Sequence, residues 1–208
     1  MSEEGEGNGE GGGGNVGGEQ ALPAERHCAL FDTAIGPCGI AWRGDAVTRV
    51  MLPLMDREAT LAELQWQSGA ELAPPPWPMF VAAAVSGMQA LLSGEPADLA
   101  GVPLDWAGIG HFEQKVYEAA RRLLPGHTST YDELAQVMGN PGAARAVDVA
   151  LSRNPWLLLV PCHRVLAGHG RLGGYSAPGG AGTKRRLLDI EALGLHSKTT
   201  APPAHGDD

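Results

Sequence analysis

The hydrophobic pattern of the chain changes character near its middle. Residues 29–52, "ALFDTAIGPCGIAWRGDAVTRVML", hold short β-type apolar runs broken by "GPCG" and "RGD", which predicts a small antiparallel sheet. A proline-stiffened connection, "ELAPPPWP", leads to "MFVAAAVSGMQALLSG", which predicts a helix that ends at Gly94. "GVPLDWAG", residues 101–108, is either one more strand or the crossover into the second half. We therefore expect an N-terminal α/β domain over residues 25–100.

The second half has the pattern of amphipathic helices. In "HFEQKVYEAARRLLPG", Phe112, Val116 and Leu123 share one face, and the Pro-Gly pair at residues 125–126 should end the helix. In "TYDELAQVMG", Thr130 and Glu133 have the spacing of a capping box, in which each side chain accepts a hydrogen bond from the other residue's backbone N–H. A second helix is therefore predicted to begin there.

A tight "GNPG" turn separates this helix from a third one. Asn140 can cap the third helix, Pro141 fits its first position, and the helix should run to about Arg153. Two helices joined by such a turn have the outline of a helix-turn-helix, although two packed helices without any nucleic-acid role share that outline. The small residues of "GAARA" allow a close approach to a DNA groove, and the lone Arg145 can reach between bases.

Composition and charge refine this interpretation. The net charge is −9, but residues 1–20 alone hold five Glu, whereas residues 108–198 hold eleven Lys and Arg against seven Asp and Glu. Phosphates respond to local charge, so the second half suits a nucleic-acid partner, although charge alone also fits a solvated mixed surface. Residues 1–24 and 197–208 cannot bury enough apolar area to offset chain entropy, so we expect both to be disordered.

The 208 residues are 43% hydrophobic, which suffices for a core. An α/β fold of the α+β type is expected, with the small antiparallel-sheet domain followed by a helical, winged-helix-like domain over residues 101–196. Three cysteines without a CxxC motif argue against a disulfide framework and for a reducing, intracellular setting. Neither an apolar run long enough to cross a bilayer nor a signal peptide is evident, so we expect no membrane partner.

The reactive side chains follow the apolar run "WLLLV", where a buried strand should end, in the motif "PCHRV". A cysteine attacks as its thiolate, and we expect the sulfur of Cys162 to be held ionised at the floor of a cavity. Because neighbouring side chains of a strand point to opposite faces, contact with His163 requires the chain to turn at Pro161. Glu191 could then orient the histidine and complete a Cys-His-Glu relay. A buried, unreactive cysteine is the alternative.

The stretch "GHTSTYDELAQVMGNPGAARAVDVALSRNPWLLLVPCHRVLAGHGRLGGYSAPGG", followed by "KRRLLDIE", closely resembles the 6-O-alkylguanine-DNA alkyltransferases, also called methylated-DNA–protein-cysteine methyltransferases. "PCHRV" is the most specific signature, and the resemblance covers roughly residues 30–196. It implies direct repair of double-stranded DNA: the damaged guanine is rotated out of the stack, and its alkyl group passes once, without a cofactor, to Cys162. It leaves 4-O-alkylthymine open as a second substrate.

The resemblance also implies a role for each matching residue. His163 is the base that deprotonates Cys162 through a bridging water, with Glu191 behind it, and the amide of Asn154 ties the recognition helix to the cysteine segment. The carbonyls of Cys162 and Val165 accept from the guanine amino group. The remaining implied roles are help to the departing guanine and rotation of its phosphate (Tyr131), a pocket wall (Tyr175), a donor near the alkylated oxygen (Ser176), filling of the gap in the DNA (Arg145), and close DNA contact (Ala143 and Ala144).

Three departures from the family pattern matter. Asp148 stands where the family usually has glycine, within i, i+3 reach of Arg145, so we expect it to pin the arginine and weaken DNA affinity. The segment "APGGAGT" is about two residues longer than usual before Lys184, which could alter the alkyl groups admitted. His27, Cys28 and Cys38 do not match the zinc positions of some relatives, so no metal is expected.

Other functions compete with repair. A lesion-recognition module would rotate the base without chemistry and recruit other factors, although such family members replace the cysteine that this chain keeps. A Cys-His hydrolase would need an oxyanion-hole loop and leaves the helix-turn-helix unexplained, and an alkylation-sensing regulator would need a further domain. We expect a monomer without an obligate protein partner, located in the cytoplasm with the nucleoid of a prokaryote or in the nucleus of a eukaryote.

Overall fold

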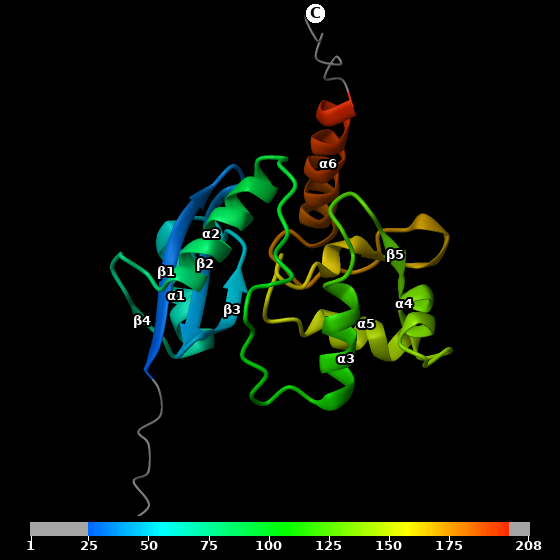
Figure 1. The fold of residues 1–208 in the computed structure, drawn as a ribbon, viewed down its shortest axis with the longest axis horizontal. Coiled ribbons are helices and arrows are strands. Elements are labelled where there is room, and N and C mark those ends of the chain that lie inside the picture. The colour runs from blue at the N-terminus through cyan, green and yellow to red at the C-terminus, as the bar shows by residue number, and fades with distance from the viewer. Residues whose placement is uncertain (1–24, 200–208) are drawn as a thin grey trace, which may run out of the picture.

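The structure is a computed structural model that describes residues 25–199 of the chain (Figure 1). The segments predicted to be disordered, residues 1–24 and most of 197–208, lie outside this range, and the last helix continues to Thr199. The N-terminal sheet has the order β3-β2-β1-β4, in which β1 and β2 and then β2 and β3 pair in antiparallel fashion. Its strands are β1 (Arg26–Thr33), β2 (Gly36–Arg43), β3 (Ala46–Met51) and β4 (Glu71–Leu72).

The predicted antiparallel sheet is thus confirmed in its three main strands and gains a short edge strand, because β4 pairs with β1 in parallel. "RGD" forms the turn between β2 and β3, as expected. "GPCG" forms the first four residues of β2 rather than a break between strands. Its first residue, Gly36, has a φ of 123°, a backbone conformation that favours glycine, and so Gly36 marks the end of the turn between β1 and β2.

Two helices cover opposite faces of this sheet (Figure 1). Helix α2 (Met79–Leu92) was predicted and ends before Gly94, whereas α1 (Arg57–Ser68) was not anticipated. Successive side chains of β1 alternate between the two layers, as the period of a strand requires. Ala29 and Phe31 belong to the main core with α2, and Cys28 and Leu30 belong to a smaller core with Leu64 of α1.

The second half of the chain docks on the edge of β3. The backbone N–H groups of Val47 and Val50 donate to the carbonyls of Pro103 and Pro155, each over 2.9 Å, and Trp156 donates from its indole nitrogen to the carbonyl of Val47 over 2.7 Å. Residues 101–108 are therefore the crossover, which pairs with the sheet through an isolated bridge between Val47 and Leu104 and through an ion pair between Arg43 and Asp105. One continuous hydrophobic core spans both halves.

The helical half packs three helices against one another and ends in a fourth (Figure 1). The predicted capping box is confirmed: the Thr130 hydroxyl accepts from the N–H of Glu133 over 3.1 Å, and the Glu133 carboxylate accepts from the N–H of Thr130 over 2.7 Å. The elements are α3 (His111–Ala120), β5 (Ser129–Thr130), α4 (Tyr131–Val137), α5 (Ala144–Ser152), the 3-10 turn η1 (Cys162–Arg164), β6 (Val165–Leu166), η2 (Gly168–Gly170) and α6 (Gly180–Thr199), with β5 and β6 paired in parallel.

Three predicted boundaries are wrong for local backbone reasons. Helix α5 begins at Ala144 rather than after Asn140, because Gly142 has a φ of 90° and cannot continue a right-handed helix. Helix α3 ends at Ala120, before the expected Pro-Gly stop, in a turn of i to i+3 hydrogen bonds. The apolar run at residues 156–160 is buried but is not a strand, because Leu158 has a φ of 70° and the run folds back on itself.

Within the described residues, no helix combines the length and the apolar character needed to cross a membrane.

Helix α6 crosses the end of α2 at a close backbone contact. A Cβ atom added to Gly194 would overlap the carbonyl oxygen of Gly94, which is rigid backbone. We predict that Gly194→Ala lowers the free energy of unfolding by about 2 kcal/mol, since the helices must separate. Gly182→Ala in the same helix meets nothing within 4 Å, so it should be neutral or stabilising by up to about 1 kcal/mol. Chemical denaturation measures both, and equal effects would contradict this packing.

Candidate active site

The cysteine segment is a turn rather than the end of a strand. Pro161 has a φ of −78° and a ψ of 64°, after which Cys162–Arg164 form the 3-10 turn η1. The turn predicted at Pro161 is therefore confirmed. Both Cys162 and His163 are buried in this turn.

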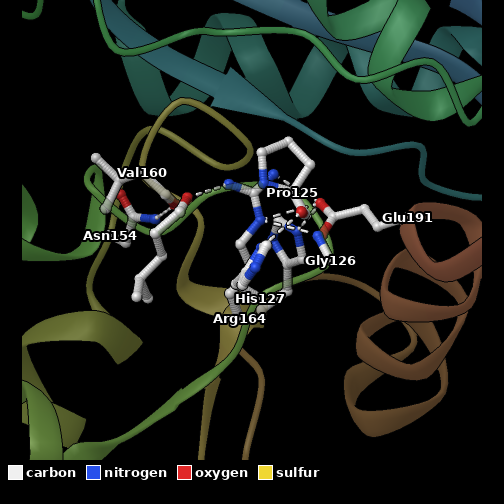
Figure 2. A network of polar contacts seen from close by, with 9 residues as sticks. Pro125, Gly126, His127, Asn154, Val160, Arg164 and Glu191 are labelled. Carbon is white, nitrogen blue, oxygen red and sulfur yellow. Dashed lines mark hydrogen bonds and ion pairs between the residues drawn. The ribbon is translucent and has the colours of Figure 1, made fainter. Parts of the chain in front are cut away.

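Asn154 connects helix α5 to this turn. Its amide nitrogen donates to the carbonyl of Val160 over 2.8 Å (Figure 2). The same nitrogen donates to the sulfur of Cys162 over 3.2 Å. Its amide oxygen accepts from the N–H of Trp156 over 2.9 Å. Because Asn154 follows α5 by only two residues, the position of the sulfur is set relative to that helix.

His163 is fully buried, and its imidazole ring is hydrogen-bonded through one nitrogen only among the described residues. Its Nε2 lies 2.9 Å from an oxygen of Glu191, which fits an N–H that donates to the carboxylate. Its Nδ1 has no hydrogen-bond partner among the described residues. Burial lowers the pKa of His163 and outweighs the opposing effect of Glu191, so the imidazole is neutral and Nδ1 carries the available lone pair.

Glu191 is the centre of a buried polar network that Figure 2 shows from close by. Arg164 donates to both of its oxygens, from Nε over 3.1 Å and from Nη2 over 2.7 Å, and the N–H of Gly126 donates over 2.9 Å. Burial alone would raise the pKa of Glu191, but the hydrogen bonds from His163 and Arg164 lower it to about 2. The carboxylate is therefore charged at any physiological pH.

Arg164 has a part in this site that the sequence analysis did not assign. Besides its contacts to Glu191, it donates from Nη1 to the carbonyl of Leu123 over 2.6 Å, which anchors the turn to the end of the α3 region. The signal was present in the "PCHR" motif, where the guanidinium stands next to the histidine. Only the fold shows that both side chains bind one carboxylate.

The protonation state expected for Cys162 needs correction. Burial raises the pKa of its thiol, and the hydrogen bond from Asn154 and the charge of Lys184 oppose this increase without reversing it. The protein alone therefore holds a thiol rather than an ionised sulfur. A thiolate has to be formed by proton transfer when the substrate is bound.

Lys184 is a second residue that the sequence analysis missed. Its side chain is buried, and its Nζ donates to the carbonyls of Val165 over 2.7 Å and Gly174 over 3.3 Å. The ammonium also lies 5.9 Å from the ring centroid of Tyr131. Burial lowers its pKa, while the negative forms of Cys162 and Asp148 raise it. Its spacing of seven from Glu191 places both on one face of α6, a signal that could have identified it.

Tyr131 is the first residue of α4 and is half-buried beside the site. Burial raises the pKa of its hydroxyl, and so does the neighbouring carboxylate of Asp148, which interacts with that hydroxyl. The expectation that Asp148 pins Arg145 is wrong, since no ion pair joins these two side chains in the described part of the chain. Arg145 is exposed near the start of α5, next to the half-buried Ala143 and Ala144.

The residues expected to form a base pocket have different surroundings. Ser176 is exposed and lines a cavity of about 500 Å³ together with Asn154 and Leu157. The hydroxyl of Tyr175 is buried without a hydrogen-bond partner among the described residues, and burial raises its pKa well above the ordinary value. The carbonyl of Val165 already accepts from Lys184, which leaves one lone pair for another donor.

Comparisons with known proteins agree on one family. The family model of the 6-O-methylguanine DNA methyltransferase DNA-binding domain matches residues 111–193. The methylated-DNA–protein-cysteine methyltransferase of Mycobacterium leprae is 38% identical over 167 residues, which are 79% of this chain and 92% of that protein. A crystal structure of Mycobacterium tuberculosis OGT in complex with DNA is 35% identical with a TM-score of 0.63, covering 81% of this chain and 94% of that one. A crystal structure of the Mycobacterium tuberculosis O6-methylguanine methyltransferase has a TM-score of 0.66 at 32% identity and covers 86% and 96%.

The Glu191 network predicts a specific dependence of stability on pH. A carboxylate whose pKa falls from 4.5 to about 2 on folding stabilises the protein above its unfolded pKa, and this contribution is lost as the pH falls toward 2. The loss amounts to about 3 kcal/mol. We predict that Glu191→Gln destabilises the protein by about 3 kcal/mol at pH 7 and that the difference from the parent shrinks toward pH 2.5.

Denaturant unfolding between pH 7 and pH 2.5 measures this difference. Asp189→Asn removes an exposed carboxylate from the same helix and controls for the change in net charge. A stability difference between parent and Glu191→Gln that stays constant over the whole range would contradict the charged state of Glu191.

Proposed function

The chain belongs to the methylated-DNA–protein-cysteine methyltransferases, and we propose that it repairs 6-O-alkylguanine in double-stranded DNA by moving the alkyl group once to its own Cys162. The observation that carries the proposal is the buried relay of His163, Glu191 and Arg164, which stands in the same turn as the buried Cys162. A purely structural cysteine would not need a neutral base beside it and a charged carboxylate behind that base. Asn154 holds the sulfur at the end of the helix that would face DNA.

The chemistry follows from the protonation states of the site. Nδ1 of His163 takes the thiol proton through a bridging water, and the negative charge of Glu191 stabilises the imidazolium that forms. The thiolate then attacks the alkyl carbon from the side opposite the guanine oxygen. As the sulfur–carbon bond forms, the carbon–oxygen bond breaks and its electrons pass to the guanine. Atoms and electrons balance without a co-reactant, and the stable thioether explains a single turnover.

Tyr131 and Lys184 act on the charges that develop during this transfer. The raised pKa of Tyr131 keeps its hydroxyl protonated, so it can donate to the departing guanine, which becomes anionic. The Tyr131 hydroxyl must first break its interaction with Asp148. The negative charge of the Asp148 carboxylate also repels DNA phosphates and so lowers DNA affinity. The positive charge of Lys184 lowers the pKa of Cys162, so this buried cation stabilises the thiolate while it holds the carbonyl of Val165.

Base extrusion is assigned to the start of α5. Ala143 and Ala144 present little side-chain volume, which suits the close approach of the helix to a minor groove. Arg145 extends from the same turn and fills the gap that the rotated nucleotide leaves. The carbonyls of Cys162 and Val165 accept from the guanine amino group, while Tyr175 and Ser176 complete the pocket. A second candidate substrate for the same pocket is 4-O-alkylthymine.

We further propose that the protein acts as a monomer beside the DNA it repairs, in the cytoplasm of a prokaryote or the nucleus of a eukaryote. All the proposed catalytic residues lie on one chain, so the reaction needs no residue from a second copy.

Alkyl transfer to Cys162 is tested by the mass of the intact protein. Incubation with an oligonucleotide that carries one 6-O-methylguanine should add the mass of one methylene group to the parent protein, with the guanine restored. Cys162→Ala should gain nothing. An unchanged parent mass together with tight binding to the modified oligonucleotide would instead indicate a recognition module without chemistry.

The extrusion role of Arg145 predicts a difference between two substrates. Arg145→Ala should slow transfer from duplex DNA by at least tenfold, because extrusion then lacks its stabilising side chain, yet leave transfer from free 6-O-benzylguanine within about twofold. Arg185→Ala, which removes an exposed arginine of α6, is the matched control. Stopped or quenched time courses give both rates, and equal losses on both substrates would remove this role.

A further inference from the structure

A cleft lined by arginines lies at the junction of the two halves, away from the cysteine. Its volume is about 350 Å³, and its floor and walls come from the sheet, from the end of α1 and from the segment that follows α5. The side chains that define this arginine cleft are Arg26, Arg43, Arg49 and Arg153, with Asp105 as its lining carboxylate. Four guanidinium groups around one hollow stand out in a chain whose net charge is −9.

Two of the four arginines have structural partners. Arg43 forms an ion pair of 2.5 Å with Asp105, and Arg26 donates to the carbonyl of Ser68 over 3.1 Å. Arg49 and Arg153 form no ion pair within the described residues. The carboxylate of Glu63 acts on Arg49 through its charge, without an ion pair. Arg49 is half-buried on β3, where a partly desolvated cation is costly unless an anion compensates it.

The arginine cleft adjoins the region of the DNA-facing helix. It shares Arg49, Gln67 and Arg153 with the cavity of about 500 Å³ that Asn154 and Ser176 line. Arg153 follows the last residue of α5, so it lies roughly 12 Å along the helix from Arg145. B-DNA carries about seven phosphate charges over that length of its axis.

We propose that the arginine cleft binds a phosphate of the DNA backbone beside the lesion, through Arg49 of the N-terminal domain and Arg153 at the end of α5. The proposal rests on the proposed function in one respect, namely that α5 faces DNA. It gives the N-terminal domain a direct part in binding. The ligand is a phosphate diester because guanidinium groups recognise phosphate oxygens through paired N–H donors, and no base-reading geometry is required.

The test measures how DNA affinity depends on salt. In the unreactive Cys162→Ala background, the Kd for a duplex with one central 6-O-methylguanine is measured over a series of NaCl concentrations. Arg49→Gln and Arg153→Gln should each reduce the slope of log affinity against log salt by about 0.9, the value for one phosphate contact, and weaken binding roughly threefold to tenfold. Arg185→Gln, on α6, should leave the slope unchanged. Arg153 is exposed, so its variant does not depend on a buried site.

Slopes that match the parent for both Arg49→Gln and Arg153→Gln would overturn the proposal. Stabilisation of the parent by inorganic phosphate that Arg49→Gln loses, with an unchanged DNA slope, would also overturn it, because the cleft would then take a free anion. The rate of alkyl transfer from free 6-O-benzylguanine, measured with Cys162 present, separates the phosphate site from the proposed function. This rate should be equal in the parent and in Arg49→Gln. If the parent accepts no alkyl group while the slopes fall, the phosphate site stands and the repair function fails.

Discussion

The buried carboxylate of Glu191 is the interaction on which the site depends. It receives hydrogen bonds from His163, from Arg164 and from the backbone of Gly126, and these donors belong to segments far apart in the chain. Because the pKa of this carboxylate is about 2, its charge persists and selects the form of His163 that carries hydrogen on Nε2. The other ring nitrogen is thereby left as the base. Orientation, tautomer and charge of the relay follow from one residue of α6.

The same burial that makes this network strong also sets its chemistry. Desolvation raises the pKa of Cys162 and lowers that of His163, so the pair rests as a neutral thiol and a neutral imidazole. A permanently exposed thiolate would be open to oxidation and to unrelated electrophiles. A buried thiol that ionises only with an alkylated base in place confines a single-use sulfur to its proper substrate. Lys184 supplies the compensating positive charge nearby.

The two halves of the chain are joined at the segment between α5 and the cysteine turn. The edge of β3 receives the residues that follow α5, through the backbone of Pro155 and the indole of Trp156. Cys162 comes six residues after Trp156, and Asn154 comes two residues before Trp156. The N-terminal sheet therefore fixes the segment between helix α5 and the sulfur of Cys162. It also brings Arg49 to the side of Arg153 in the arginine cleft.

The local elements and the residue types of the site were readable from the sequence. Strand alternation, the Thr130–Glu133 capping box and the turn at Pro161 depend on neighbouring residues, so their patterns were readable, as was the family signature around Cys162. Helix α1, the fold-back at Leu158 and the late start of α5 depended on packing or on single φ values that no periodicity reveals. The three-dimensional fold was needed to show that Arg164 shares Glu191, that Lys184 is buried against the carbonyl of Val165, and that Asp148 meets Tyr131 instead of Arg145. Desolvation and long-range contacts set these properties, and a linear pattern carries neither.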